Sequence, residues 1–138
     1  MSPMSTTSPL GLTLTLDAIT SAASGVLLLV AGGPIAALAS PATDLFGIAL
    51  PTICRAVGLF LLAFAALALI AARGAPIRRG LVWEVFALNV AWVIGSVILV
   101  ELAWDGLTLL GRLAIIAVAA VVAVFALLQG VGLKRARA

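Results

Sequence analysis

Hydrophobic residues fill this chain in four long blocks, which are separated by short segments rich in Gly, Pro and charged residues. Each block approaches the ~20 residues that a helix needs to cross ~30 Å of bilayer hydrocarbon. The pattern predicts spans over about 12–31, 51–72, 81–103 and 107–129. Residues 1–11 are expected to form a flexible N-terminal tail, residues 12–132 a four-helix transmembrane domain, and residues 133–138 a basic C-terminal tail.

The connections between the blocks are short, so consecutive helices should be antiparallel neighbours. Gly32-Gly33-Pro34 ends the first block, and Pro34 suits the first turn of a short interfacial helix. Thr108 or Asp105 could cap the last span. The predicted fold is all-α: a four-transmembrane-helix bundle, up-down-up-down, with a short interfacial helix after the first span.

A rival interpretation of the first block is a cleaved signal peptide, because Ala37-Leu38-Ala39 resembles a cleavage site. Three features argue against it: the preceding residues contain no Lys or Arg, the apolar block is too long, and Asp17 lies inside it.

Composition supports a membrane protein and excludes several kinds of chemistry. Hydrophobic residues make up 64% of the chain and charged residues 9%, too few to cover a soluble domain of this size. The chain has no His and one Cys, which removes His-based zinc sites, Ser-His-Asp triads and intrachain disulfides. We therefore expect a non-enzymatic protein without a cofactor or metal. Its expected partners are the lipid bilayer and a homo-oligomer or larger membrane complex, and not nucleic acid.

Basic residues predict the orientation. The side that would hold both termini and the middle loop carries six of them: Arg73, Arg78, Arg79, Lys134, Arg135 and Arg137. The other side carries only Arg55 and Arg112. By the positive-inside rule, both termini should be cytoplasmic.

Polar residues inside the spans need partners, because a charge at the bilayer centre costs at least ~2.5–3.5 kcal/mol. Asp17 and Glu84 are expected near the cytoplasmic ends of the first and third spans, in a first helical turn or just after it, where the helix dipole favours carboxylates. The alternative is a cytoplasm-facing vestibule that binds a cation or protons. The full candidate site is Asp17, Ser24, Glu84, Asn89, Trp92, Ser96 and Gln129.

Asn89 lies near the middle of the third span, and Trp92 and Ser96 follow on the same helix face. This stripe should face the bundle, either as helix–helix glue worth ~0.6 kcal/mol per hydrogen bond or as a ligand contact. Gln129 could reach Asp17 or Glu84, and its position in the sequence leaves both open.

Four charged residues share the outer level of the predicted bundle: Arg55, Glu101, Asp105 and Arg112. We expect an interhelical charge cluster that fixes helix order, with at least one arginine near an acidic residue. The alternative is an anion site built around Arg55 and Arg112.

Several local motifs occur in a familiar order. They are Asp17 followed by Ser-Ala-Ala-Ser-Gly, then Gly-Gly-Pro, Arg55-Ala56-Val57-Gly58, Ala87-Leu88-Asn89 between Trp83 and Trp92, Thr108-Leu109-Leu110-Gly111 and Gln129. In this the chain resembles a family of small bacterial four-helix integral membrane proteins with no assigned activity. The resemblance implies the architecture and a bacterial inner membrane, and it implies no ligand or catalytic residue.

The chain is also similar in size and helix count to small multidrug-resistance exporters, but their central first-span Glu is absent and Asp17 is expected too near the helix end to replace it. Two functions stay open. The first is a structural or accessory membrane protein. The second is a small proton- or cation-coupled transporter or channel-like oligomer, with a polar path lined by Asp17, Glu84 and Asn89.

Overall fold

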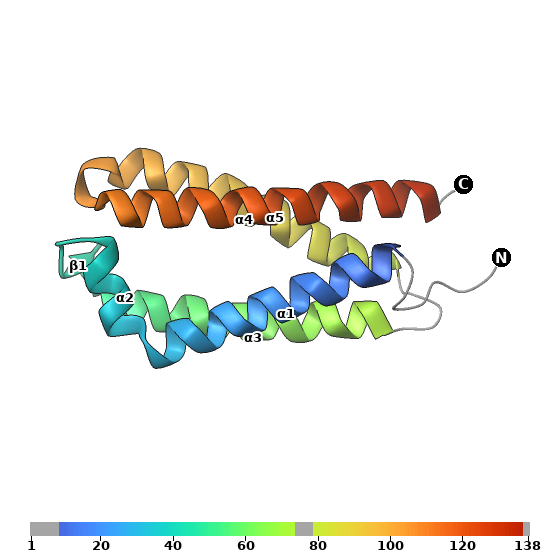
Figure 1. Cartoon of the computed structure of the whole chain (residues 1–138), viewed down its shortest axis with the longest axis horizontal. Helices are drawn as coiled ribbons and strands as arrows, with labels where there is room; N and C mark the ends of the chain where they lie inside the picture. The colour runs from blue at the N-terminus through green and yellow to red at the C-terminus, as the bar shows by residue number, and fades with distance from the viewer. Residues whose placement is uncertain (1–8, 74–78, 137–138) are drawn as a thin grey trace.

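The computed structural model describes residues 9–73 and 79–136. This part of the chain is almost entirely helical, and Figure 1 shows its arrangement. The elements in order are α1 (Pro9–Val30), α2 (Gly32–Ala39), β1 (Asp44–Leu45), β2 (Ile48–Ala49), α3 (Leu50–Arg73), α4 (Arg79–Ala103), the short 3₁₀ helix η1 (Trp104–Gly106) and α5 (Leu109–Ala136).

Four helices are long and apolar enough to cross a membrane, which confirms the predicted number of candidate spans. Their ends differ from the prediction. Helix α1 begins at Pro9, so residues 9–11 are helical, and α5 continues to Ala136 instead of ending near Gln129. Packing explains both extensions: Leu10 and Leu133 are almost fully buried in one apolar cluster. The rest of the two expected tails, 1–8 and 137–138, lies outside the described residues.

The long helices form two close pairs, α1 with α3 and α4 with α5 (Figure 1). The first pair crosses where Gly25 faces Gly58. A Cβ atom added to either glycine would lie 2.8 Å from the carbonyl oxygen of the other. No residue larger than glycine fits there without moving a backbone, so this contact sets how closely α1 and α3 approach.

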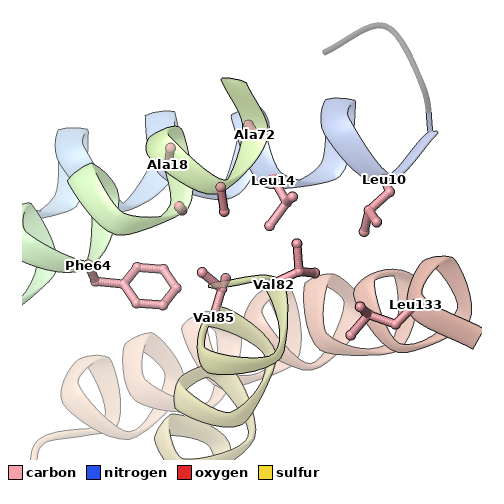
Figure 2. Packing of buried hydrophobic residues seen from close by; sticks show 10 residues of the cluster. Leu10, Leu14, Ala18, Phe64, Ala72, Val82, Val85 and Leu133 are labelled. Atoms are coloured by element: carbon pink, nitrogen blue, oxygen red, sulfur yellow. The ribbon is translucent and has the colours of Figure 1, made fainter. Parts of the chain in front are cut away.

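An apolar core joins the two pairs near the end where α1 begins and α5 ends. Figure 2 shows side chains from the two pairs pointing toward one another across this layer. Its labelled members are Leu10, Leu14 and Ala18 of α1, Phe64 and Ala72 of α3, Val82 and Val85 of α4, and Leu133 of α5. At the same end, Arg79 Nη2 donates a hydrogen bond to the Leu133 carbonyl at 3.3 Å.

Polar contacts join the two pairs at the opposite end. Thr108 Oγ1 donates to the carbonyl of Leu38 at 2.6 Å, and the Thr108 amide donates to that of Ala39 at 2.9 Å. The same hydroxyl accepts from the Gly111 amide at 3.0 Å, so Thr108 caps α5 as one of the two residues predicted for that role. These bonds tie α2 to the start of α5.

Between α2 and α3, the segment that separates the first two apolar blocks contains a minimal hairpin. Strands β1 and β2 pair antiparallel, with Asp44 opposite Ala49 and Leu45 opposite Ile48. Phe46 (φ 53°) and Gly47 (φ 78°) form the turn. Positive φ at both central residues is what a tight two-residue hairpin requires. The Phe46 side chain at its tip is 85% exposed.

Candidate functional site

Three helices bring Asp17, Asn89 and Gln129 into one buried network. Asn89 Nδ2 donates to Asp17 Oδ2 at 2.7 Å and to Gln129 Oε1 at 2.8 Å. Gln129 Nε2 donates to the same Asp17 oxygen at 2.7 Å. Each of the three residues therefore contacts the other two, although they come from α1, α4 and α5. Of the two partners considered for Gln129, the structure places it on Asp17.

The network is shielded from solvent and lies well inside the helices. The exposed fractions are 1% for Asp17, 3% for Asn89 and 0% for Gln129. Asp17 is eight residues beyond Pro9, about 12 Å along the axis at 1.5 Å per residue. The expectation that Asp17 lies in a first helical turn or just after it is wrong, because α1 begins at Pro9, earlier than its apolar pattern suggested. The helix dipole thus does little for this carboxyl group, since it acts mainly within the first turn.

Every hydrogen bond that Asp17 makes through its side chain comes from a neutral group. Besides the two amides on Oδ2, the Ser21 hydroxyl lies 3.5 Å from Oδ1, at the outer limit for a hydrogen bond. Ser21 is one turn further along α1 and is also buried. Within residues 9–73 and 79–136, no Lys or Arg pairs with Asp17. The carboxyl group is therefore solvated by protein dipoles without a neutralising charge.

A half-open cavity of about 210 Å³ adjoins the network at the middle of all four long helices. Asp17, Ser21 and Asn89 contribute to its wall, whereas Gln129 does not. The remaining wall residues are Thr20 and Ser24 of α1; Phe60, Leu61 and Phe64 of α3; Leu88 and Trp92 of α4; and Ala117, Val118, Val121, Val122 and Phe125 of α5. Gln129 thus holds Asp17 and Asn89 from behind the cavity wall.

The other candidate residues are placed unequally. Ser24 and Trp92 line the cavity, and the buried indole Nε1 of Trp92 has no hydrogen-bond partner in the described part of the chain. Ser96 is half-buried but lies outside the cavity wall. Glu84 is exposed and also lies outside it. Of the polar path considered for the transporter alternative, Asp17 and Asn89 line the cavity and Glu84 does not.

The expected outer charge cluster has a different arrangement. Arg112 Nε and Nη2 donate to the Trp104 carbonyl at 2.9 and 2.6 Å, and the guanidinium carbon lies 4.3 Å from the centre of the Trp104 ring. Arg55, Glu101 and Asp105 are exposed. No ion pair joins the four charged residues in the part of the chain that the structure describes. The Arg112 guanidinium therefore contacts the backbone carbonyl and the indole ring of Trp104, where a carboxylate partner was expected.

Sequence reasoning missed several residues of the site. Ser21 entered only as the first residue of the Ser-Ala-Ala-Ser-Gly motif, although its position four residues after Asp17 placed it on the same helix face. Phe60 and Phe64 carried no signal, since aromatic residues in an apolar span usually face either lipid or core. Their role depends on how α3 is rotated against α4, which no local pattern shows.

Comparisons with protein families, with curated proteins and with solved structures give no match to this chain. Membership in a family of small bacterial four-helix proteins therefore stays a prediction from local motifs.

Proposed function

We propose that this chain is a non-enzymatic integral membrane protein that binds an exchangeable proton or cation at Asp17 and acts as a small carrier. The observation on which this proposal depends is the placement of Asp17. The residue is 1% exposed, lies well within a candidate span, adjoins a cavity and accepts hydrogen bonds from neutral donors. A carboxylate so placed costs several kcal/mol unless a proton or cation joins it.

The hydrogen bonds around Asp17 suit both charge states. Oδ2 accepts from Asn89 and Gln129 whether or not the carboxyl group is protonated. Ser21 Oγ lies near Oδ1 and can reverse its role, since a hydroxyl both donates and accepts. It donates to a carboxylate and accepts from a carboxylic acid. Binding and loss of a proton would then need no rearrangement of the two amides.

Transport would also need access from the two sides of the membrane in turn. The cavity lies between the α1–α3 pair and the α4–α5 pair, and the apolar core of Leu10, Leu14, Val82 and Leu133 closes the bundle at one end. Thr108 joins α2 to α5 at the other end. We propose that the two helix pairs tilt relative to each other and open these two ends alternately, within one chain or a homo-oligomer.

The proposed location is a bacterial inner membrane, with an up-down-up-down path, both termini cytoplasmic and α2 at the outer interface. The charges support this orientation. Arg73 ends α3, Arg79 begins α4, and Lys134 and Arg135 lie in the last turn of α5. Arg55 and Arg112 lie toward the opposite ends of α3 and α5. An excess of basic residues marks the cytoplasmic side of membrane proteins.

The test is flux of protons and small cations in proteoliposomes. Asp17→Asn should abolish flux, because it keeps the shape of the side chain but removes the exchangeable charge. Glu84→Gln is the matched control, since Glu84 is exposed and outside the cavity wall, and it should leave flux unchanged. Infrared difference spectra of the wild type should show a carboxylic acid C=O band that depends on pH and disappears in Asp17→Asn. No flux together with no such band would overturn the proposal.

A second candidate function is an accessory protein in which the network only joins helices. The specific observation in its favour is that three hydrogen bonds already link α1, α4 and α5. This candidate predicts no flux in the wild type, loss of a larger membrane complex in Asp17→Leu, and retention of that complex in Asp17→Asn.

A further inference from the structure

The cavity beside Asp17 is large enough to hold a small ligand. Its volume of about 210 Å³ exceeds the ~150 Å³ of an engineered apolar cavity that binds benzene. It is smaller than the ~300–1,000 Å³ of pockets that hold drug-sized molecules. A ligand of about one ring that carries a compact branched substituent is therefore the largest occupant expected without repacking of the helices.

Aromatic side chains supply much of the cavity wall. Phe60 and Phe64 come from α3, Trp92 from α4 and Phe125 from α5, so three of the four long helices contribute. The Phe60 and Trp92 rings are nearly parallel, at an angle of 9° with ring centres 6.3 Å apart. The face of an aromatic ring carries partial negative charge and attracts cations, most strongly for Trp.

The polar part of the wall favours a positive ligand. Asp17 is the one ionisable residue among the cavity's described lining residues, and no cation neutralises it within residues 9–73 and 79–136. The buried N–H of Trp92 has no hydrogen-bond partner in the described residues, and an acceptor on a ligand could meet it whatever the charge of that ligand. One negative charge and several aromatic rings together match a small organic cation better than a neutral hydrocarbon or a hydrated metal ion.

We infer that the cavity binds a small organic monocation of about one ring, which takes the place of the proton on Asp17. This inference rests on the proposed exchange of protons at Asp17. In the exchange, the Asp17 O–H bond breaks and its proton passes to water. The carboxylate keeps the electron pair and faces the bound cation. Charge within the membrane is unchanged, since one positive charge replaces another.

The probe is phenyltrimethylammonium, and its neutral control is tert-butylbenzene, which has the same shape with carbon in place of nitrogen. The protein is the full chain in detergent with Trp83→Phe and Trp104→Phe, so that Trp92 alone reports binding by its fluorescence. We expect saturable binding of the cation, release of about one proton per cation to a weakly buffered indicator, and tighter binding as the pH rises. Phe60→Leu should weaken cation binding about tenfold through loss of one aromatic face.

Asp17→Asn should remove the binding of the cation and the release of protons, whereas Glu84→Gln should retain both. The pH dependence in the Asp17-containing protein keeps the inference testable if Asp17→Asn does not fold. Equal binding of tert-butylbenzene, cation binding without proton release, or cation binding that survives in Asp17→Asn would each overturn the inference. Absence of cation binding in a protein whose infrared band shows exchange at Asp17 would overturn this inference alone. Absence of both would overturn the proposed function as well.

Discussion

Gln129 Nε2 donates a hydrogen bond to Asp17 Oδ2 at 2.7 Å, across 112 positions in the sequence. The bond joins the first and last long helices, which pack in different pairs. Because Gln129 is outside the cavity wall, its amide restrains the carboxyl group without occupying the space beside it. Asn89 completes the arrangement by donating to both residues. The carboxyl group is thereby held in place at the edge of an otherwise apolar cavity.

The first prediction concerns Asn89. Asn89→Leu removes two hydrogen bonds, which leaves Gln129 Oε1 without its donor and Asp17 Oδ2 with one amide donor instead of two. It should therefore lower the free energy of unfolding by about 1–3 kcal/mol. Asn89→Gln should cost less, because a second amide can still donate. The measurement is reversible unfolding in mixed micelles.

The control for that prediction replaces the whole network. A triple variant with Leu at positions 17, 89 and 129 removes the polar groups together and should recover much of the stability, because no buried polar group is left without a partner. Equal stability of Asn89→Leu and the wild type would contradict the structural importance of these bonds.

The second prediction concerns the crossing of α1 and α3. Gly25→Ala and Gly58→Ala each place a methyl group 2.8 Å from a backbone oxygen, and the helices must separate to accept it. We expect a loss of about 1–3 kcal/mol for either change, as for other overpacked contacts. Gly95→Ala is the matched control: its added Cβ atom meets nothing within 4 Å, so this change should be neutral or slightly stabilising. If all three variants unfold alike, the close crossing is not a stabilising contact.

The third prediction concerns Arg112. Arg112→Lys should lose stability, because the ammonium group cannot reproduce two parallel N–H donors to the Trp104 carbonyl together with stacking on its ring. Charge-assisted hydrogen bonds are worth about 1.5–3 kcal/mol, which sets the upper limit of the loss. Neutralising Glu101 or Asp105 should not rescue Arg112→Ala, since neither carboxylate pairs with this guanidinium in the described residues. If either change rescued Arg112→Ala, the result would contradict this arrangement and support the interhelical ion pair predicted from the sequence.

The contrast between these sites shows what could be predicted from the sequence. The four candidate spans follow from local composition, and the cap at Thr108 follows from a residue type that favours helix starts. The partners of Asp17 depend on how α1, α4 and α5 pack, and apolar helices rich in Ala offer many similar packings. Asn89 could be placed inside the bundle because an amide facing lipid would lack partners. The identity of those partners could not be predicted.

The ion pair expected in the outer charge cluster is absent from the described residues for a different physical reason. Opposite charges at one depth suggest an ion pair. Free backbone carbonyls at a helix end also accept hydrogen bonds from a guanidinium, and a prediction based on side chains alone overlooks them. Arg112 finds such a carbonyl at Trp104, next to the ring on which it stacks. Similarly, the extent of α1 was underestimated because residues 9–11 look like part of a tail, although Leu10 belongs to the core.

The last prediction concerns orientation, and it can be tested with two single-cysteine variants. Both start from Cys54→Ala, which removes the one native thiol. Thr43→Cys places a thiol in the exposed segment between α2 and β1, and Ser5→Cys places one before α1. A membrane-impermeant maleimide should label Thr43→Cys on intact cells and Ser5→Cys only after the cells are permeabilised. The reason is the excess of Arg and Lys at the opposite end of the bundle from Thr43. The reverse labelling pattern would invert the proposed topology and place the basic ends of α3 and α5 outside the cell.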